Sequence, residues 1–531
     1  MFRKSKVVLI FITIIMIILA GCSSGTNTST EGTQNSEGDA SGSTSIAEKF
    51  NMAMGAQPPS LDPHISTAIA TRDIAMQVFE TLVTIDKDYK PVPMLAESID
   101  VSEDGKTYTF NLRQGIKFHN GKEMTSEDVV ASMNRFVEKS GATKVLLDGA
   151  VFKADGDYKV ILDVPNPSTL IMTSLAARSP MPAIMPKEVI ESAPAEGINE
   201  YIGTGPLKFV EWKQDQYIKL TKNDDYQPLE TESNGQAGKK EVFIKDFYIH
   251  FVPDTSTQVA GLQTGEYDLL LEAPNDNYEL LANDPSLGTS INDYGPYNLI
   301  FNKHKGIFTN ADMRKAINAG INSEEILRTS FMHEDIYELD PSYMSPQSAD
   351  WYSDAGKEYY NQNDPEKAKE WLEKAGYNGE PIKIVTTRDY AHIYNTGVVL
   401  QQQLEKIGVK VSLEIYDWPT ALNIRNKEPD KWDIFITGTP FVLTPLELYV
   451  YTIEAYMDPN NQKVTELLNS IKNAQTEDEA KQKWEELQAY TWEYLPVAKM
   501  GNFFKVSAFK DYVKDYKYQE GPILWNIKLT K

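Results

Sequence analysis

The chain of 531 residues contains one cysteine, Cys22, so its fold cannot rest on disulfide bonds within the chain. A large protein without disulfide bonds must be stabilised by burying apolar side chains. Hydrophobic residues make up 41% of the sequence, which is enough to build a large core in more than one subdomain. The sequence therefore predicts a large globular body that is held together by its own interior.

Cys22 lies just after the one long apolar run of the sequence, residues 7–20. This run follows a short basic start. A basic start, a short apolar core and small residues before a break are typical of a secretory signal peptide. The apolar run is shorter than the ~20 residues that span a bilayer comfortably, which disfavours a retained membrane helix. We therefore expect residues 1–21 to be a signal peptide.

The run Leu19-Ala20-Gly21-Cys22 resembles the bacterial lipobox, in which the cysteine receives a lipid and becomes the mature N-terminus. This resemblance implies an extracytoplasmic protein that is anchored to the cell membrane through Cys22, since buried acyl methylenes contribute ~0.8 kcal/mol each. The alternative is an ordinary signal peptide followed by an accidental cysteine. The rest of the segment 22–45 is polar and lacks aromatic residues, so we expect a flexible linker before the folded body.

The formal net charge of −24 disfavours nucleic acid or a bare anionic membrane surface as a partner. The acidic balance by itself indicates only that the body stays soluble, and we expect it to be a monomer.

Helical and strand-like periodicities alternate along the folded body. Strand patterns cover residues 49–54, 382–385, 409–416 and 432–437, and helical patterns cover residues 71–81, 255–264, 365–375 and 398–407. Such a succession predicts an α/β domain with a substantially parallel sheet.

Several motifs, in order along the chain, resemble the family 5 extracellular solute-binding proteins, which serve dipeptide, oligopeptide and nickel ABC importers. The motifs are PSLDP at 59–63, PMLAES at 93–98, LRQGIKFHNG at 112–121, TSEDV at 125–129, GTGPLKFVEW at 203–212, LQTGEYD at 262–268, LIFN at 299–302 and MRKAI at 313–317. One such match would carry little weight, whereas this ordered series covers the chain from about Phe50 to its C-terminus.

The resemblance implies a two-lobed, periplasmic-binding-protein-like α/β fold (type II, cluster C) with hinge strands and an inserted subdomain. In that layout lobe I takes residues 46–82, 203–287 and 496–531, the inserted subdomain takes residues 83–202, and lobe II takes residues 288–495. The resemblance also implies a solute receptor whose lobes close over the ligand and whose closed form docks on an ABC permease with its ATPase subunits.

The first candidates for ligand binding lie after the expected strand 382–385. Arg388 is expected at the carboxyl edge of a sheet, where open α/β sheets bind ligands, and its guanidinium can bind a ligand carboxylate through two hydrogen bonds. A basic residue at about this point does so in peptide-binding relatives, although a surface salt bridge is an equally good interpretation. Tyr390 and Trp418 offer flat faces for a side chain or a sugar ring, but Trp418 can equally belong to the core.

The loop after the strand 432–437 lines the cleft in the family, and its candidate residues are Thr437, Gly438, Thr439 and Phe441. Ser60 and Asp62 of the PSLDP loop complete the set. Dipeptide receptors carry an aspartate in the cleft loop for the α-ammonium of the ligand, whereas the first acid here is Glu447. This departure favours an oligopeptide over a dipeptide, with an oligosaccharide as the alternative.

Catalysis finds little support in the sequence. No G-x-S-x-G elbow is present, and Cys22 is assigned to a lipid, so a hydrolase has no nucleophile to use. A secreted glycoside hydrolase, the remotest alternative, needs two carboxylates roughly 5–9 Å apart, and nothing singles out such a pair. The six histidines have no metal-ligand spacing, which disfavours a nickel receptor. We therefore expect a binding protein without a cofactor or a metal, and not an enzyme.

Overall fold

The computed structural model of the chain describes residues 47–140, 144–458 and 461–530. The predicted signal peptide, Cys22 and the linker lie outside the described residues. Within these three ranges no helix combines the length and the hydropathy that crossing a membrane requires.

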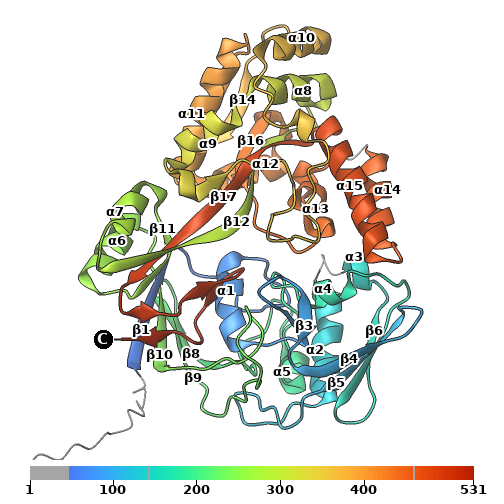
Figure 1. The fold of residues 1–531 in the computed structure, drawn as a ribbon, viewed down its shortest axis with the longest axis vertical. Coiled ribbons are helices and arrows are strands. Elements are labelled where there is room, and N and C mark those ends of the chain that lie inside the picture. Colours follow the sequence, from blue (N-terminus) through green and yellow to red (C-terminus); the bar gives the residue numbers. More distant parts are fainter. Residues whose placement is uncertain (1–46, 141–143, 459–460, 531) are drawn as a thin grey trace, which may run out of the picture. The chain divides into compact units, whose positions relative to one another are not determined.

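An eleven-stranded sheet runs through the body (Figure 1). In spatial order its strands are β15 (Val411–Ile415), β14 (Ile382–Thr386), β16 (Ile434–Gly438), β12 (Leu287–Phe301), β17 (Val497–Lys510), β11 (Leu269–Ala273), β1 (Ala47–Met54), β10 (Ile244–Phe251), β9 (Tyr217–Lys222) and β8 (Leu207–Lys213). The short strand β13 (Tyr337–Glu338) also pairs with β17.

Strand direction differs between the parts of this sheet. Strands β15, β14 and β16 are parallel to one another, and so are β11, β1 and β10. Strands β12 and β17 pair antiparallel with each other and with these two groups, and β9 and β8 are antiparallel as well. The prediction of a substantially parallel sheet holds for the two groups of three strands and is wrong for the others, which pair antiparallel with their neighbours.

Strands β12 and β17 are the two long strands that join both halves of the sheet. They pair with each other from Leu287 and Lys510 to Ile300 and Val497, and the register shifts after Asp293 and after Tyr297. Figure 1 shows them running from the region of β11, α6 and α7 up to the region of β16 and α9. This arrangement confirms the expected two-lobed α/β fold with hinge strands.

Helices pack on both halves of the sheet. They are α1 (Ile69–Val78), α6 (Thr255–Thr264), α7 (Tyr278–Ala282), α8 (Ala311–Gly320), α9 (Ser323–Phe331), α10 (Pro365–Ala375), α11 (Ala391–Lys406), α12 (Trp418–Lys427), α13 (Tyr449–Thr452), α14 (Gln462–Lys472) and α15 (Glu477–Tyr494). Short C-terminal strands follow as β18 (Val513–Lys514), β19 (Lys517–Tyr518), β20 (Pro522–Ile523) and β21 (Lys528–Leu529).

Local capping explains where several predicted helices begin and end. The predicted helix 365–375 is confirmed, because Asp364 accepts the Lys367 N–H at 3.0 Å and Gly376 ends α10 with φ 71°. Helix α11 begins seven residues before the predicted start, at Ala391. Helix α1 ends at Val78, earlier than predicted, because the Val78 carbonyl accepts the Gly205 N–H at 3.0 Å.

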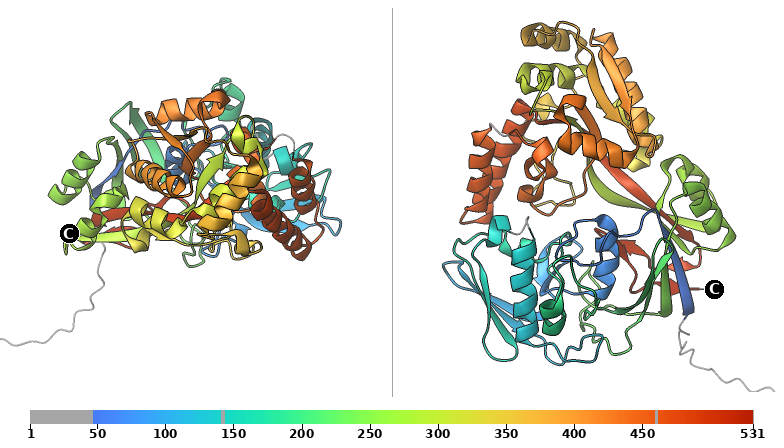
Figure 2. Two further views of the ribbon diagram at one scale, coloured as in Figure 1. Left: turned by 90° about the horizontal axis from the view of Figure 1, so that it is seen from above. Right: turned by 180° about the vertical axis from the view of Figure 1, so that it is seen from behind.

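The inserted subdomain has its own antiparallel sheet, β4 (Ala96–Val101), β5 (Thr107–Leu112), β7 (Lys159–Asp163) and β6 (Val151–Ala154), together with the helices α2 (Ser126–Lys139), α3 (Lys144–Leu147), α4 (Ile171–Leu175) and α5 (Lys187–Ser192). It begins with a hairpin of β2 (Val83–Ile85) and β3 (Pro91–Pro93). Phe110, Met133 and Phe136 belong to its fully buried core. Seen from behind in Figure 2, this subdomain (cyan) lies beside α1 and below the red helices α14 and α15.

Candidate ligand-binding cleft

Tyr390 and Trp418 come together at the carboxyl edge of β14. The Asp389 carboxylate accepts the backbone N–H of Trp418 at 2.7 Å, which joins the loop after β14 to the start of α12. The Tyr390 ring stands perpendicular to the Trp418 ring, with 5.4 Å between the centroids. Tyr390 keeps 44% of its surface exposed, so this aromatic pair can receive a ligand.

Arg388 is exposed, and its guanidinium contacts Tyr394 rather than Tyr390 or Trp418. Its guanidinium lies 4.8 Å from the centroid of the Tyr394 ring and donates to the Tyr394 hydroxyl at 3.3 Å. No carboxylate among the described residues forms an ion pair with it. The charge of Arg388 is therefore not neutralised within the described parts of the chain, and its contacts do not lead to the other cleft residues.

The loop 437–441 is fastened to the hinge strand β12. The Thr439 N–H donates to the Pro296 carbonyl at 2.9 Å, and the Phe441 N–H donates to the Tyr294 carbonyl at 2.5 Å. Thr437 and Gly438 are part of β16, and the Thr437 hydroxyl donates to the Gly438 carbonyl at 2.9 Å. The backbone of Thr439 and Phe441 is therefore held against β12, and Thr437 and Gly438 belong to the strand itself.

Phe441 contacts the inserted subdomain across the gap between the lobes. Its ring lies 4.8 Å from the ring of Tyr89, centroid to centroid. Beside this contact is a cavity of about 410 Å³ whose lining includes Tyr89, Leu170, Trp351 and Leu443. Residues after β16 and residues of the β2–β3 hairpin therefore enclose space together.

A charged group that the sequence did not point to lies on the hinge strands. Lys505 of β17 forms an ion pair with Glu272 of β11, and its ammonium lies 4.1 Å from the centroid of the Tyr294 ring. The Lys505 and Glu272 side chains are 23% and 47% exposed. Burial raises the pKa of Tyr390, and the charge of Glu272 raises it further. A row of rings joins the ion pair to the aromatic pair, since the His392 ring lies 6.0 Å from the rings of both Tyr390 and Phe503, and the Phe503 ring lies 4.7 Å from that of Tyr294, centroid to centroid.

Arg72 and Asp73 of α1 form an ion pair next to the C-terminal segment. Arg72 donates to Asp73 at 2.8 Å and to the Tyr518 hydroxyl at 3.4 Å. Burial raises the pKa of Asp73, and the charge of Glu272 adds to this effect. The two residues are 9% and 1% exposed, so this ion pair lies inside the protein.

Two further carboxylates lie near the cleft with raised pKa values. Burial raises the pKa of Glu447 to about 7, with a further contribution from the charge of Glu520. Burial also raises the pKa of Asp293 to about 6, and its Oδ1 atom is buried without a hydrogen-bond partner among the described residues. Glu447 accepts the backbone N–H groups of Leu443 and Thr444 at 3.1 Å, so it shapes the loop after Phe441.

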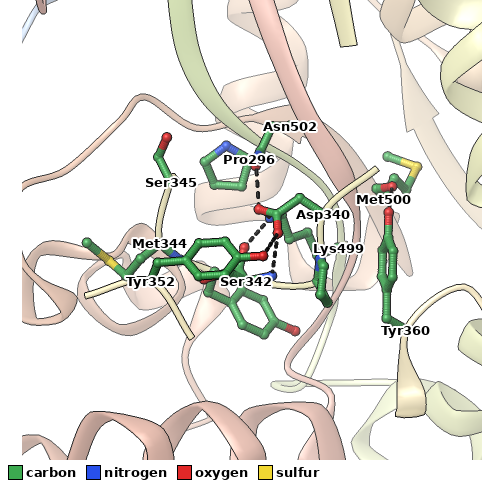
Figure 3. Close-up of polar contacts among 12 residues, drawn as sticks. Pro296, Asp340, Ser342, Met344, Ser345, Tyr352, Tyr360, Lys499, Met500 and Asn502 are labelled. Atoms are coloured by element: carbon green, nitrogen blue, oxygen red, sulfur yellow. Dashed lines mark hydrogen bonds and ion pairs between the residues drawn. The ribbon is translucent and has the colours of Figure 1, made fainter. Parts of the chain in front are cut away.

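A buried ion pair holds the neighbouring segment against β17 (Figure 3). Asp340 accepts hydrogen bonds from Lys499 at 3.0 Å, from Asn502 at 2.9 Å and from the Tyr352 hydroxyl at 3.1 Å. The Ser345 hydroxyl of this segment lies 2.6 Å from Asp293. The ion pair therefore positions the segment 340–345 against the hinge strands.

Of the two candidates in the PSLDP loop, Ser60 is half-buried and lines a cavity of about 500 Å³, whereas Asp62 is held inside the protein. Asp62 is fully buried and forms an ion pair with Arg135 at 2.5 Å. It also accepts the backbone N–H groups of His64 at 3.0 Å and of Ile198 at 2.9 Å, while the Ser60 hydroxyl accepts the Asp62 N–H at 3.0 Å. These contacts use the carboxylate inside the protein, so Asp62 has a structural role.

Gly295 allows the close approach of the cleft loop to β12. Its φ is 141°, and a Cβ atom here would lie 2.4 Å from the Thr439 carbonyl oxygen. We expect Gly295→Ala to lower the stability by roughly 1–3 kcal/mol, because it strains the backbone and displaces the loop. Chemical denaturation measures this loss. The control is Gly156→Ala, where φ is 77° and no described atom lies within 4 Å; equal losses for the two variants would contradict the close approach.

The described residues contain no group of three or more His, Cys, Asp and Glu side chains that could hold a metal ion. The cleft is thus built from aromatic rings, paired charges and backbone groups, which suit the binding of an organic solute.

Known proteins are similar to this chain in sequence and in fold. The chain is 29% identical over 499 residues to the probable peptide ABC transporter periplasmic-binding protein y4tO of Sinorhizobium fredii, covering 88% of this chain and 91% of that protein. It is 25% identical over 569 residues to the oligopeptide-binding protein AppA of Bacillus subtilis, covering 99% and 98%.

Two solved structures have similar folds. The structure of Bacillus subtilis AppA in complex with a nonapeptide has a TM-score of 0.75 and 24% identity, covering 92% of this chain and all of that one. The structure of AgaA from A. tumefaciens R10, in complex with agropinic acid, has a TM-score of 0.76 and 25% identity, covering 91% and 99%. The family model of bacterial extracellular solute-binding proteins, family 5, matches residues 90–461. Together with the two-lobed fold and its cleft, this match shows that the chain belongs to the family 5 bacterial extracellular solute-binding proteins.

Proposed function

We propose that this protein captures peptides, oligopeptides in preference to dipeptides, and delivers them to the permease of an ABC importer. The observation that carries the proposal is the row of ring contacts from Tyr390 through His392 and Phe503 to Tyr294, which joins the Tyr390–Trp418 pair to the Lys505–Glu272 ion pair. Aromatic faces bind side chains of varied shape, and charged groups bind the termini and the backbone of a peptide. The similarity to y4tO and AppA supports this proposal.

We further propose that residues 46–82, 203–287 and 496–531 act as lobe I, residues 83–202 as the inserted subdomain and residues 288–495 as lobe II. Closure of the lobes about β12 and β17 encloses the ligand, and no covalent bond is made or broken. The lipobox-like run at Cys22 supports anchoring to the cell membrane. We also propose that the anchored protein acts as a monomer. The intact mass of protein extracted from membranes tests the anchor, which requires loss of residues 1–21 and addition of a lipid.

An oligosaccharide or another non-peptide solute is the second candidate. The exposed ring of Tyr390 and the half-buried ring of Trp418 favour it, since both also suit a sugar ring, and the structure of AgaA holds agropinic acid in a similar fold. This candidate predicts binding without dependence on peptide termini.

Native mass spectrometry of the purified protein, followed by thermal-shift measurements, tests the function. A ligand at 100 times its Kd stabilises the protein by about 2.7 kcal/mol, so peptides of two to nine residues are expected to raise the melting temperature by a few degrees. Peptides longer than two residues should give the larger shifts. A series of oligosaccharides that raises the melting temperature while all peptides leave it unchanged would refute the peptide proposal.

Trp418→Ala is expected to weaken the best-binding peptide of that series about fivefold, because it removes an aromatic contact of about 1 kcal/mol. Isothermal titration calorimetry measures the change in Kd. The matched control is Trp371→Ala on α10, where the ammonium groups of Lys374 and Lys315 lie 4.3 and 5.0 Å from the ring centroid. If both variants bind like the wild type, Trp418 is not part of the ligand site.

A further inference from the structure

Two leucines are buried across the contact between the inserted subdomain and the chain after β16, one from each side. Leu443, in the loop after β16, is 5% exposed and belongs to the same buried cluster as Phe110 of the inserted subdomain. Leu170, just before α4 of the inserted subdomain, is 2% exposed and belongs to the buried cluster of Trp351 and Leu448. Each part of the protein therefore buries a leucine in the core of the other part.

Further apolar side chains surround these two leucines. The Phe441 ring lies 4.8 Å from the Tyr89 ring, centroid to centroid, and also packs against the core of the inserted subdomain. Leu146 of α3 packs against both buried clusters. The cavity of about 410 Å³ lies between the same elements, since its lining includes Tyr89, Leu170 and Leu443. Separating the two parts would expose these side chains to water, which is unfavourable.

The loop that carries Leu443 is held in shape by its own contacts. The Glu447 carboxylate accepts the backbone N–H groups of Leu443 and Thr444, both at 3.1 Å. The Phe441 N–H donates to the Tyr294 carbonyl of β12 at 2.5 Å. Because the loop is ordered by these hydrogen bonds, little conformational entropy is lost when Leu443 enters the other core.

The contact lies away from the strands that join both halves of the sheet. In Figure 1, α3 and α4 lie on the right, below α15, whereas the lower ends of β12 and β17 lie on the left, next to α6 and α7; the view from behind in Figure 2 shows the same separation. When two lobes rotate about hinge strands, the contacts farthest from the hinge separate most. Such a rotation must therefore pull Leu170 and Leu443 out of the cores in which they are buried.

We propose that the inserted subdomain is a clasp, which holds the proposed lobe II in the closed position before any ligand has bound. This inference rests on the proposed closure of the lobes about β12 and β17. The clasp consists of Leu170, Leu443 and Phe441 with their surroundings, and it involves no group of the ligand. It slows both the entry and the release of the ligand, because each requires the clasp to open.

Small-angle X-ray scattering of the purified, ligand-free protein tests the clasp. We expect Leu443→Ala to increase the radius of gyration, because the variant opens without ligand. The matched control is Leu162→Ala on β7, where a fully buried leucine of the same cluster is truncated in the same way. This control should lower the melting temperature and leave the radius of gyration unchanged.

Ligand binding gives a second readout of the clasp. If Leu443→Ala lowers the closed fraction of the ligand-free protein from about nine tenths to about one tenth, its Kd rises about tenfold. Association should become faster, because more of the free protein is open, and dissociation should become faster still. Stopped-flow fluorescence with the best-binding ligand of the thermal-shift series measures both rates.

A ligand-free Leu443→Ala protein that is as compact as the wild type would overturn the clasp, and so would an equal expansion of Leu162→Ala. Slower association of ligand with Leu443→Ala would also contradict it. The scattering comparison needs no ligand, so a thermal-shift series in which nothing binds would refute the proposed function and leave the clasp to be decided by scattering. If Leu443→Ala fails to fold, Phe441→Ala takes its place with the same expected expansion, because the Phe441 ring is only half-buried.

Discussion

Replacing Arg135 with methionine is expected to lower the free energy of unfolding by about 3–5 kcal/mol. Arg135 donates to both carboxylate oxygens of Asp62, at 3.1 and 2.5 Å, and Asp62 is fully buried. Without the guanidinium, the carboxylate stays buried without its counter-ion. Chemical denaturation followed by tryptophan fluorescence measures the loss.

An exposed ion pair supplies the control for Arg135. Lys153 and Asp163 lie 2.8 Å apart with side chains 60% and 44% exposed, so Lys153→Met should cost less than about 1 kcal/mol. The double variant Asp62→Asn, Arg135→Met should recover part of the loss, because it removes the stranded charge. A stability of Arg135→Met within 1 kcal/mol of the wild type would show that Asp62 regains water and that the ion pair is dispensable.

His64 is expected to make the protein less stable in acid, by up to about 3 kcal/mol at 1.36 kcal/mol for each unit of pKa shift. His64 is fully buried, its Nδ1 atom accepts from Arg135 at 3.0 Å, and its Nε2 atom lies 2.8 Å from the Ala183 carbonyl. Burial lowers its pKa from 6.5 to about 4, so the folded protein holds this side chain neutral.

The direction of the pH effect follows from the lowered pKa. The unfolded chain takes up a proton on His64 near pH 6.5, before the folded protein does, so the stabilisation is complete above that pH. It is lost progressively as the pH falls from about 6.5 to 4. Between pH 7 and pH 4.5 the free energy of unfolding should fall less steeply for His64→Gln than for the wild type. His304→Gln, at an exposed position, should follow the wild type. If the free energy of unfolding of the wild type and of His64→Gln depends on pH in the same way, His64 does not titrate as described.

Local signals in the sequence predicted much of the secondary structure. Asp364 and Gly376 mark the ends of α10, and Thr125, whose backbone N–H donates to Asp128 at 3.0 Å, marks the start of α2. Such signals are reliable because a cap and its helix lie within a few residues of each other. The directions of the middle strands were not predictable in this way, because β12 and β17 meet only in the folded chain.

The residues of the candidate site also differ in whether the local sequence indicates them or only the folded chain brings them together. Tyr390 and Trp418 were candidates because of their flat aromatic faces, and they lie together because each follows a strand of the same parallel group, whose carboxyl ends meet at one edge. Lys505 and Glu272 lie 233 residues apart, and nothing in either local sequence indicates the partner. Asp62 has the sequence context of a family motif, but its burial against Arg135 depends on α2 packing on the loop.

The sequence by itself determined the family, the two-lobed α/β class and the ends of helices such as α10, because these depend on short motifs, periodicity and capping within a few residues. Only the tertiary structure decided which charges are paired in the interior and which face the cleft. Asp62 and Arg135 neutralise each other in the interior, while Lys505 and Glu272 pair where their side chains stay partly exposed. The physical reason is that the pairing of a charge depends on distances of a few ångströms between segments that the chain brings together only on folding.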